Sequence, residues 1–504
     1  RAMNPQLMLL AMALPLVGAG ALLLLRKHPN LRETATLVAG VALAALVISL
    51  WPHVDERPRL ELWTWMPGLS FAFEMEPLGL LFASVAGCLW PVTSVYAIGY
   101  MRAAGEKNQT RFYFCFAIAI FAAMMIAFAG NGLTLFVGYE VLTLSTWPLV
   151  AHKGTPEARN GARVYLIVLL ATSIGLLLPA LVWTYALTGT LEFRDGGILA
   201  GHASPQVLGV LYALFLFGIG KAALMPFHRW LPSAMVAPTP VSALLHAVAV
   251  VKAGVFTVMK ITIYFFGMDA MRFSEVGQPM AWVAAFTIVA AAVIAIRQDN
   301  LKARLAYSTV SQLSYIVLGA ALASPDALTE GALHIVTHAA GKITLFFCAG
   351  AIYIAAHKTK VSELDGLGPH MPFTFAAFTL AGMSIIGLPP LAGSWDKLLL
   401  MEGAVEAGTP VMIGVLLVSS LLGIAYLMPI PIRAFFMPER GAPAEADDPS
   451  GEARTTRRPQ IREAPWACVV PLCLTALACF VLFFFEDQLV EPLADRLGHS
   501  WEQE

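Results

Sequence analysis

Five lysines in this 504-residue chain occupy positions where a lysine is costly. Each lies inside a long apolar run, or where such a run is interrupted: Lys221, Lys252, Lys260, Lys342 and Lys397. A charged lysine at the centre of a bilayer costs on the order of 2.5–3.5 kcal/mol. Because ionisable residues at such depth usually mark a path for protons or ions, these lysines predict a titratable interior.

One acid and three histidines accompany these lysines. Glu140 is the clearest acid within an apolar run, and His246, His334 and His338 add imidazoles at similar depth. Burial brings the pKa of a lysine toward neutrality and a nearby carboxylate raises it again, so a Glu–Lys pair that opens and closes can hold or release a proton. Imidazole titrates between such groups, whereas a guanidinium keeps its proton. The pattern predicts proton transfer, and we expect no buried arginine.

Simpler interpretations remain open for these residues. Lys260 follows Lys252 toward one end of the same run, and the alternative is that it extends to the membrane surface. His246 or His334 could equally be a histidine satisfied within a packed core. The alternative for the whole set is static contact between helices.

The composition requires membrane-spanning helices to position these groups. Apolar residues make up 58% of the chain and charged residues 13%, with a mean hydropathy of +0.71; a soluble chain carries about 25% charged residues. Apolar runs of about 20 residues recur, each long enough to cross a bilayer as a helix. The net charge of −1 gives no indication of nucleic-acid binding, and the six cysteines lack metal-ligand spacing. We expect neither metal nor cofactor.

The apolar runs predict an all-α membrane protein with about 14 transmembrane helices. The expected spans are 5–25, 33–51, 77–99, 111–129, 132–151, 163–189, 207–227, 240–267, 279–296, 304–323, 328–356, 372–407, 411–435 and 465–485. Because residues 5–25 have the character of an ordinary first span, we expect no cleavable signal peptide. No stretch fits a separate soluble domain.

The distribution of basic residues predicts the orientation. Cytoplasmic loops carry an excess of Lys and Arg. Loops on one predicted side hold most of the basic residues, whereas the other side, with both termini, holds only Arg1, Arg57, Arg59, Arg194, Arg272 and Arg496. We therefore expect a multi-pass protein of the bacterial inner membrane with both termini in the periplasm or outside the cell.

Two apolar runs are interrupted by glycine and proline. Lys221 lies in GIGKAALMPFHRWLP at residues 218–232, and Lys397 in GLPPLAGSWDK at residues 387–397. Proline removes a backbone donor and breaks a helix, and paired breaks in two halves are typical of transporters with inverted repeats. The predicted organisation is helices 1–3 at 1–110, a first five-helix repeat at 111–267, an inverted second repeat at 279–435, a hydrophilic cytoplasmic loop at 436–464, and a last helix with a short tail at 465–504.

Longer motifs carry a family resemblance. PFHRWLPSA at 226–234, APTPVSALLH at 237–246, LAYSTVSQ at 305–312 and HIVTHAAGK at 334–342 closely resemble the signature of antiporter-like subunits. Such subunits occur in respiratory complex I, in Mrp-type Na⁺/H⁺ antiporters and in membrane-bound hydrogenases. The resemblance covers nearly the whole chain, and it implies a fold of 14 core helices with two inverted five-helix repeats.

The resemblance also implies roles for the titratable residues. Glu140 looks like the acid that pairs with Lys221 in a first half-channel, and Lys252 resembles the bridging residue, with His246 beside it. His334, His338 and Lys342 match the continuation of a central axis, and Lys397 looks like the end of a second half-channel. Protons are expected to pass along this axis and leave through the second break.

The resemblance leaves the parent complex open. We expect a proton-translocating subunit of a multisubunit monovalent cation/proton antiporter, closest to the D-type subunits of Mrp antiporters. The expected partners are other hydrophobic subunits, the expected ion is the proton, and Na⁺ is a further candidate. The chain has no nucleotide loop, metal cluster or nucleophile–base pair that would indicate an enzyme by itself. One alternative is a proton-pumping subunit of a complex I-type NADH:quinone oxidoreductase or hydrogenase, and another is a proton-coupled subunit of an inorganic-carbon uptake complex.

Overall fold

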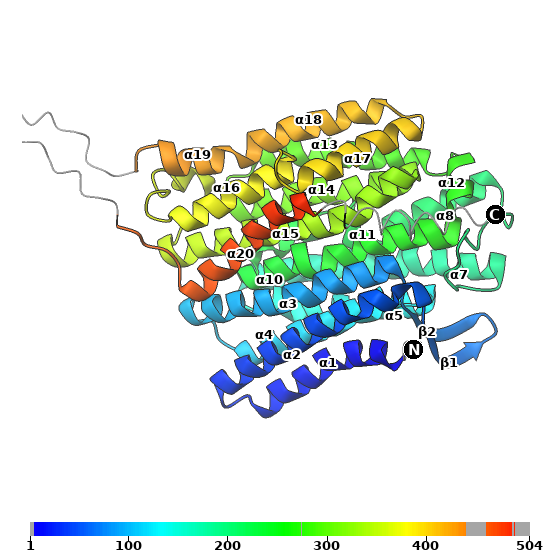
Figure 1. Cartoon of the computed structure of the whole chain (residues 1–504), viewed down its shortest axis with the longest axis horizontal. Helices are drawn as coiled ribbons and strands as arrows, with labels where there is room; N and C mark the ends of the chain where they lie inside the picture. Colours follow the sequence, from blue (N-terminus) through cyan, green and yellow to red (C-terminus); the bar gives the residue numbers. More distant parts are fainter. Residues whose placement is uncertain (1–4, 274, 440–459, 486–487, 489–504) are drawn as a thin grey trace, which may run out of the picture.

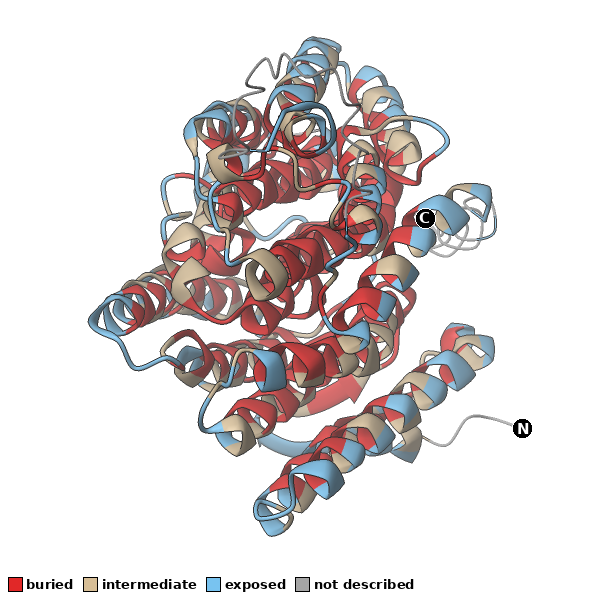
Figure 2. Cartoon of the chain, turned by 90° about the vertical axis from the view of Figure 1, so that its left-hand side faces the viewer, coloured by how far each residue is buried: buried red, intermediate tan, exposed pale blue. Residues whose placement is uncertain are grey.

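A bundle of long helices forms the body of the molecule. The computed structural model describes residues 5–273, 275–439, 460–485 and 488. Its helices lie side by side along one direction, with α1 and α2 at one edge, α18 at the other, and α11 and α15 between them (Figure 1). Buried residues gather in the middle of the bundle and exposed ones toward its periphery (Figure 2).

The first half of the chain contains α1 (Gln6–Leu24), α2 (Pro29–Leu50), α3 (Pro77–Ala103), α4 (Gln109–Ala127), α5 (Gly132–Val150), α6 (Pro156–Thr172), α7 (Leu178–Thr188), α8 (Pro205–Gly218), α9 (Trp230–Ser233), α10 (Thr239–Ala243) and α11 (Val250–Ile261). The second half contains α12 (Met268–Phe273), α13 (Gln278–Arg297), α14 (Leu301–Leu322), α15 (Pro325–Ala356), α16 (Pro372–Ile386), α17 (Gly393–Glu406), α18 (Val411–Leu427), α19 (Pro429–Phe436) and α20 (Trp466–Phe484).

The predicted membrane fold is confirmed. In the described residues 12 helical segments are long and apolar enough to cross a membrane, and two shorter apolar helices, α8 and α16, accompany them. Each predicted span overlaps one of these segments, although 207–227 extends beyond α8 and 372–407 also includes α17. The inverted five-helix repeats and the limits of the units remain a prediction, and the loop at 436–464 lies largely outside the described residues.

A β-hairpin that the sequence did not indicate projects from one end of the bundle (Figure 1). Strands β1 (Arg59–Met66) and β2 (Leu69–Glu74) pair antiparallel. Gly68, in the turn between them, has a φ of +75°, and a Cβ there would lie 2.1 Å from the Gly189 carbonyl oxygen. Only glycine fits this close approach, which fixes the hairpin against the chain that follows α7.

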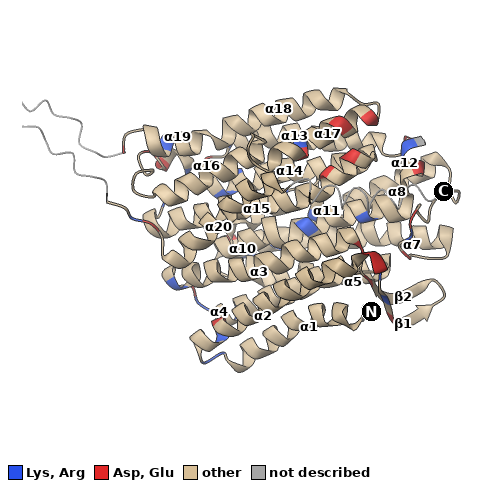
Figure 3. Cartoon of the chain, in the orientation of Figure 1, with Lys and Arg blue, Asp and Glu red and all other residues tan. Residues whose placement is uncertain are grey.

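Charged residues occur mainly near the ends of the helices, with few between them (Figure 3). The expectation that no arginine is buried is wrong for Arg32 and Arg304. Arg304, in the first turn of α14, donates to the carbonyl oxygens of Gln298 and Tyr426 at 2.8 and 3.2 Å. A guanidinium at a helix end can be buried because neighbouring carbonyls satisfy its donors.

Candidate functional site

The first broken helix places Lys221 inside the bundle. Helix α8 ends at Gly218, and a short 3₁₀ turn follows at Gly220–Ala222. A Cβ on Gly218 would lie 2.4 Å from the backbone nitrogen of Leu177, and one on Gly220 would lie 2.2 Å from the Thr172 hydroxyl. The two glycines therefore let the unwound chain pack closely against α6 and the turn that follows it.

The Lys221 ammonium is held by oxygens of α5. Its Nζ donates to the Tyr139 carbonyl oxygen at 2.8 Å and to the Thr143 hydroxyl at 2.5 Å, and it lies 3.2 Å from the centre of the Tyr139 ring. Glu140 is half-buried, and its Oε1 has no hydrogen-bond partner within the described part of the chain. The predicted partners thus lie on adjoining segments and interact electrostatically, but the structure records no direct ion pair between them.

The centre of the site joins α11 to α15. Lys252 Nζ lies 2.8 Å from His338 Nδ1, and both side chains are buried. His334, one turn earlier on α15, stacks on His338 with ring centres 5.3 Å apart. Lysine and imidazole can exchange a proton directly across such a contact.

Lys342 and His246 lie beside this centre. Lys342 Nζ donates to the Ser308 hydroxyl at 2.5 Å. His246 lies on a π-helical turn at Leu244–Val248, where neither ring nitrogen has a hydrogen-bond partner among the described residues. Its ring packs 4.4 Å from that of Phe346, so His246 is not a histidine satisfied by its core neighbours.

Lys397 lies beside the break in the second interrupted helix. Helix α16 ends before Gly387, which has a φ of +88°, and α17 starts at Gly393. Lys397 Nζ donates to the Ile386 carbonyl oxygen at 2.5 Å, a group freed by the break, and to the Ser420 hydroxyl at 2.8 Å. A cavity of about 640 Å³ adjoins this ammonium.

Sequence analysis did not assign two interior acids, Asp396 and Glu330, to the site. Asp396 is the sequence neighbour of Lys397, and its Oδ2 lies 2.9 Å from His334 Nδ1 and accepts a hydrogen bond from Thr337. Glu330 is completely buried on α15, one turn before His334. Glu330 follows shortly after the start of a predicted span, so in the sequence it resembles a residue near the membrane surface.

Lys260 is buried within the chain, beside the start of α3 and the end of α4. It is 1% exposed, it lies 2.8 Å from Glu76 Oε1, and it donates to the Ala129 carbonyl oxygen at 2.7 Å. The Phe193 ring centre lies 4.6 Å from its Nζ. Glu76 was missed because it precedes α3 and resembles a loop acid.

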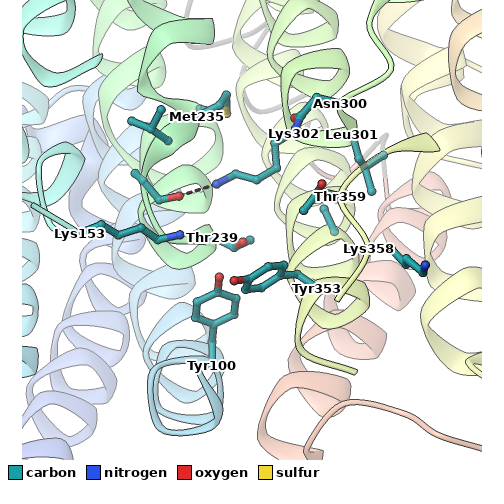
Figure 4. Close-up of a pocket in the computed structure, with 13 residues that line it drawn as sticks. Tyr100, Lys153, Met235, Thr239, Asn300, Leu301, Lys302, Tyr353, Lys358 and Thr359 are labelled. Carbon is teal, nitrogen blue, oxygen red and sulfur yellow. Dashed lines mark hydrogen bonds between the residues drawn. The ribbon is translucent and has the colours of Figure 1, made fainter. Parts of the chain in front are cut away.

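A separate cavity of about 220 Å³ lies at the end of the bundle where α14 begins (Figure 4). Three lysines line it, Lys153, Lys302 and Lys358, together with Tyr100 and Tyr353, and none of the described lining residues is acidic. Lys302 Nζ donates to the Ala237 carbonyl oxygen at 2.5 Å. This cavity contains none of the predicted site residues.

The fold and the site define a multi-pass membrane protein with titratable side chains buried across its interior. The chain belongs to the NADH:quinone oxidoreductase/Mrp antiporter transmembrane family, whose model matches residues 129–423. That range contains every predicted site residue. Among the residues the structure describes, no group of three or more His, Cys, Asp or Glu is arranged to hold a metal ion.

Individual relatives come from both branches of this family. The N subunit of NADH-quinone oxidoreductase from Desulforudis audaxviator (strain MP104C) is 32% identical over 499 residues, covering 97% of each chain. The A/B subunit of a probable K⁺/H⁺ antiporter from Rhizobium meliloti (strain 1021) is 31% identical over 94% of this chain and 47% of that protein. A chain of the Mrp complex from Dietzia sp. DQ12-45-1b shares the fold, with a TM-score of 0.84 and 24% identity over 99% of this chain and 97% of that one. The chain is thus an antiporter-like membrane subunit.

Proposed function

We propose that this subunit moves protons along its buried row of glutamate, lysine and histidine, within a multisubunit monovalent cation/proton antiporter of the Mrp type. The observation that carries the proposal is the 2.8 Å contact between Lys252 Nζ and His338 Nδ1. Two adjacent basic groups, both buried, cannot both be charged without a large electrostatic cost, so this pair favours sharing one proton.

The row has a proposed direction and order. Lys221 and Glu140 form its first part, Lys252 with His246 and His338 its centre, and Lys342 and Lys397 its continuation toward the second break. Helix α11 connects the first two parts, because a Cβ on its Gly254 would lie 2.4 Å from the carbonyl carbon of Lys221. Rigid packing of this kind keeps the two parts at a fixed separation.

The proposed setting is a bacterial inner membrane with both termini on the periplasmic side. The orientation rests on the loop charges, and these include the three lysines that line the cavity in Figure 4. The proposed partners are other hydrophobic subunits, because the relatives named above are subunits and not whole enzymes or antiporters.

A second candidate is supported by the similarity to the N subunit of NADH-quinone oxidoreductase, which extends over 97% of both chains. In that case this chain would belong to the proton-pumping arm of a quinone-reducing complex. Co-purifying proteins separate the two candidates: small hydrophobic subunits alone favour the antiporter, and redox subunits favour the pump.

The test uses inverted membrane vesicles from the native host. The host's own copy of this chain is deleted, and the wild-type or a variant chain is produced in its place. An acridine dye reports the pH gradient across the vesicle membrane. Addition of Na⁺ or K⁺ to respiring vesicles tests the antiporter, and addition of NADH alone tests the pump. Lys252→Met should abolish the dye response and leave co-purification of partners unchanged, whereas the surface variant Lys107→Met should behave as wild type. Wild-type transport by Lys252→Met, or by Glu140→Gln, would refute the proposal.

A further inference from the structure

Two buried acids meet at one histidine beside the proposed row. His334 Nδ1 lies 2.9 Å from Asp396 Oδ2 and 3.8 Å from Glu330 Oε1. Glu330 and His334 come from α15, and Asp396 comes from α17. The three side chains are between 0% and 3% exposed, so water does not compensate their charges.

The carboxylates are incompletely satisfied. Neither oxygen of Glu330 has a hydrogen-bond partner in the described part of the chain, and the same holds for Asp396 Oδ1. An ionised carboxylate can only accept hydrogen bonds, and burying one without donors is expensive. Two such groups near one imidazole are therefore stable only if the cluster takes up protons and shares them.

Groups on α11, α14 and α17 face this cluster. On α14, the Tyr315 ring stacks on His334 at 5.8 Å, and Gly319 leaves room for Glu330, whose Oε2 would lie 3.2 Å from a Cβ there. Lys252 on α11 and Lys397 on α17 act electrostatically on His334. The cluster thus joins the row at its centre, through His334, and Glu330 lies one turn closer to the start of α15.

Glu330 lies close to one end of the bundle. It is about 8 Å along α15 from Pro325, the first residue of that helix. The Ser324 hydroxyl, at the N-cap of α15, donates to the Gly403 carbonyl oxygen at 3.0 Å, so α17 also reaches this end. The lysine-lined cavity lies at the opposite end, where α14 begins and Leu301 N donates to the Thr359 carbonyl oxygen.

We propose that protons leave the row at His338 and pass through His334, Asp396 and Glu330 to the end of the bundle where α15 begins. The inference rests on the proposed function and adds the exit to it. In the transfer step, an N–H bond of the protonated His338 imidazolium breaks as an N–H bond forms at His334 Nε2, which leaves His338 neutral. The N–H bond at His334 Nδ1 then breaks as an O–H bond forms on the ionised carboxylate of Asp396 or Glu330. The His334 imidazole is neutral before and after the step.

This assignment gives Lys397 a different role. Its ammonium is satisfied by the Ile386 carbonyl and the Ser420 hydroxyl, and Asp396 turns away from it toward His334. Lys397 is then the last group of the row, beside the second break, and the two acids carry the proton to the end of the bundle.

The experiment compares Glu330→Gln and Asp396→Asn with matched controls at the same end of the bundle. Glu402→Gln changes an exposed acid of α17 and Asp326→Asn a half-exposed acid of α15. Transport in the vesicle assay should fall roughly 100-fold in Glu330→Gln, the lower end of what a positioned proton-transfer group contributes, and remain normal in both controls. Glu330→Asp, which keeps a carboxyl group, should recover part of the rate.

A second readout detects the proton itself. In infrared difference spectra of the purified native complex, recorded across a pH step, the carbonyl stretch of protonated carboxyl groups should lose intensity in Glu330→Gln but not in Glu402→Gln. Unchanged transport and an unchanged carboxyl band in Glu330→Gln would overturn the inference, provided that Lys252→Met is inactive. If Lys252→Met also transports normally, the proposed function fails as well, so the two failures are distinguishable.

Discussion

Two lysines on the same helix, Lys252 and Lys260 of α11, are both buried and yet have opposite surroundings. Lys260 contacts a carboxylate, a carbonyl oxygen and the ring of Phe193, and these contacts stabilise its charged form. Lys252 instead contacts the imidazole of His338. A lysine paired with a carboxylate holds its proton, whereas a lysine paired with another base can give it up.

The comparison shows that burial alone does not identify a functional lysine. An ammonium in the membrane interior needs a partner, and the partner decides what the ammonium does. The Lys260–Glu76 pair lies where β2, α3 and α11 meet, and it serves the packing of the hairpin end. The Lys252–His338 pair lies between α11 and α15, at the centre of the proposed proton path.

The largest effect expected from this comparison is on stability. Lys260→Met leaves Glu76 buried without its cation, and removing one partner of a buried ion pair costs about 3–5 kcal/mol. Thermal unfolding in detergent, followed with a thiol-reactive dye that reaches the buried cysteines only on unfolding, should show a large loss for Lys260→Met and little for Lys252→Met. Equal losses in the two variants would remove the distinction.

The exchange of lysine for arginine sharpens the comparison in transport. Lys252→Arg keeps the positive charge but cannot release its proton, so transport should fall by roughly 100-fold, as for the loss of a positioned proton-transfer group. Lys260→Arg can still pair with Glu76 and should transport at a near-normal rate per folded molecule. Retained transport in Lys252→Arg would show that a fixed charge is enough at that position.

A double variant tests whether the Lys260–Glu76 pair is only structural. Glu76→Gln combined with Lys260→Met removes both charges, and replacing a whole buried ion pair is often close to neutral. The double variant should regain about 2 kcal/mol or more of the stability lost in Lys260→Met. No recovery would mean that Glu76 has other partners for which Gln cannot substitute.

Sequence reasoning succeeded where the signal was long or repeated. Apolar runs give the spans because each must satisfy its backbone within the bilayer, and the breaks at Gly218 and Gly387 were visible as glycines and prolines in apolar surroundings. The lysines were identified because a membrane interior makes each of them conspicuous. None of this depends on which helices are neighbours.

Sequence reasoning failed where a partner comes from a distant segment. Glu76 pairs with Lys260, and Asp396 with His334, across separations along the chain that no local pattern records. The buried Arg304 was missed for the same reason, because a carbonyl of Tyr426 satisfies it. The hairpin was overlooked because its first strand mixes charged, aliphatic and aromatic residues and lies outside any long apolar run.

The smallest effect concerns the hairpin that precedes Glu76. Gly68→Ala places a Cβ against the Gly189 carbonyl oxygen in a residue with a φ of +75°, and substitution at such a position costs about 1 kcal/mol or more. Hydrogen exchange should rise in β1, in β2 and in the segment after α7, while Gly189→Ala, also at positive φ but with no atom within 4 Å of its Cβ, should disturb the hairpin less. Because Lys252 lies two helical turns deeper along α11 than Lys260, transport should be unchanged. A loss of transport in Gly68→Ala would mean that the hairpin end and the proton path are coupled, and the two lysines of α11 could then not be treated as independent.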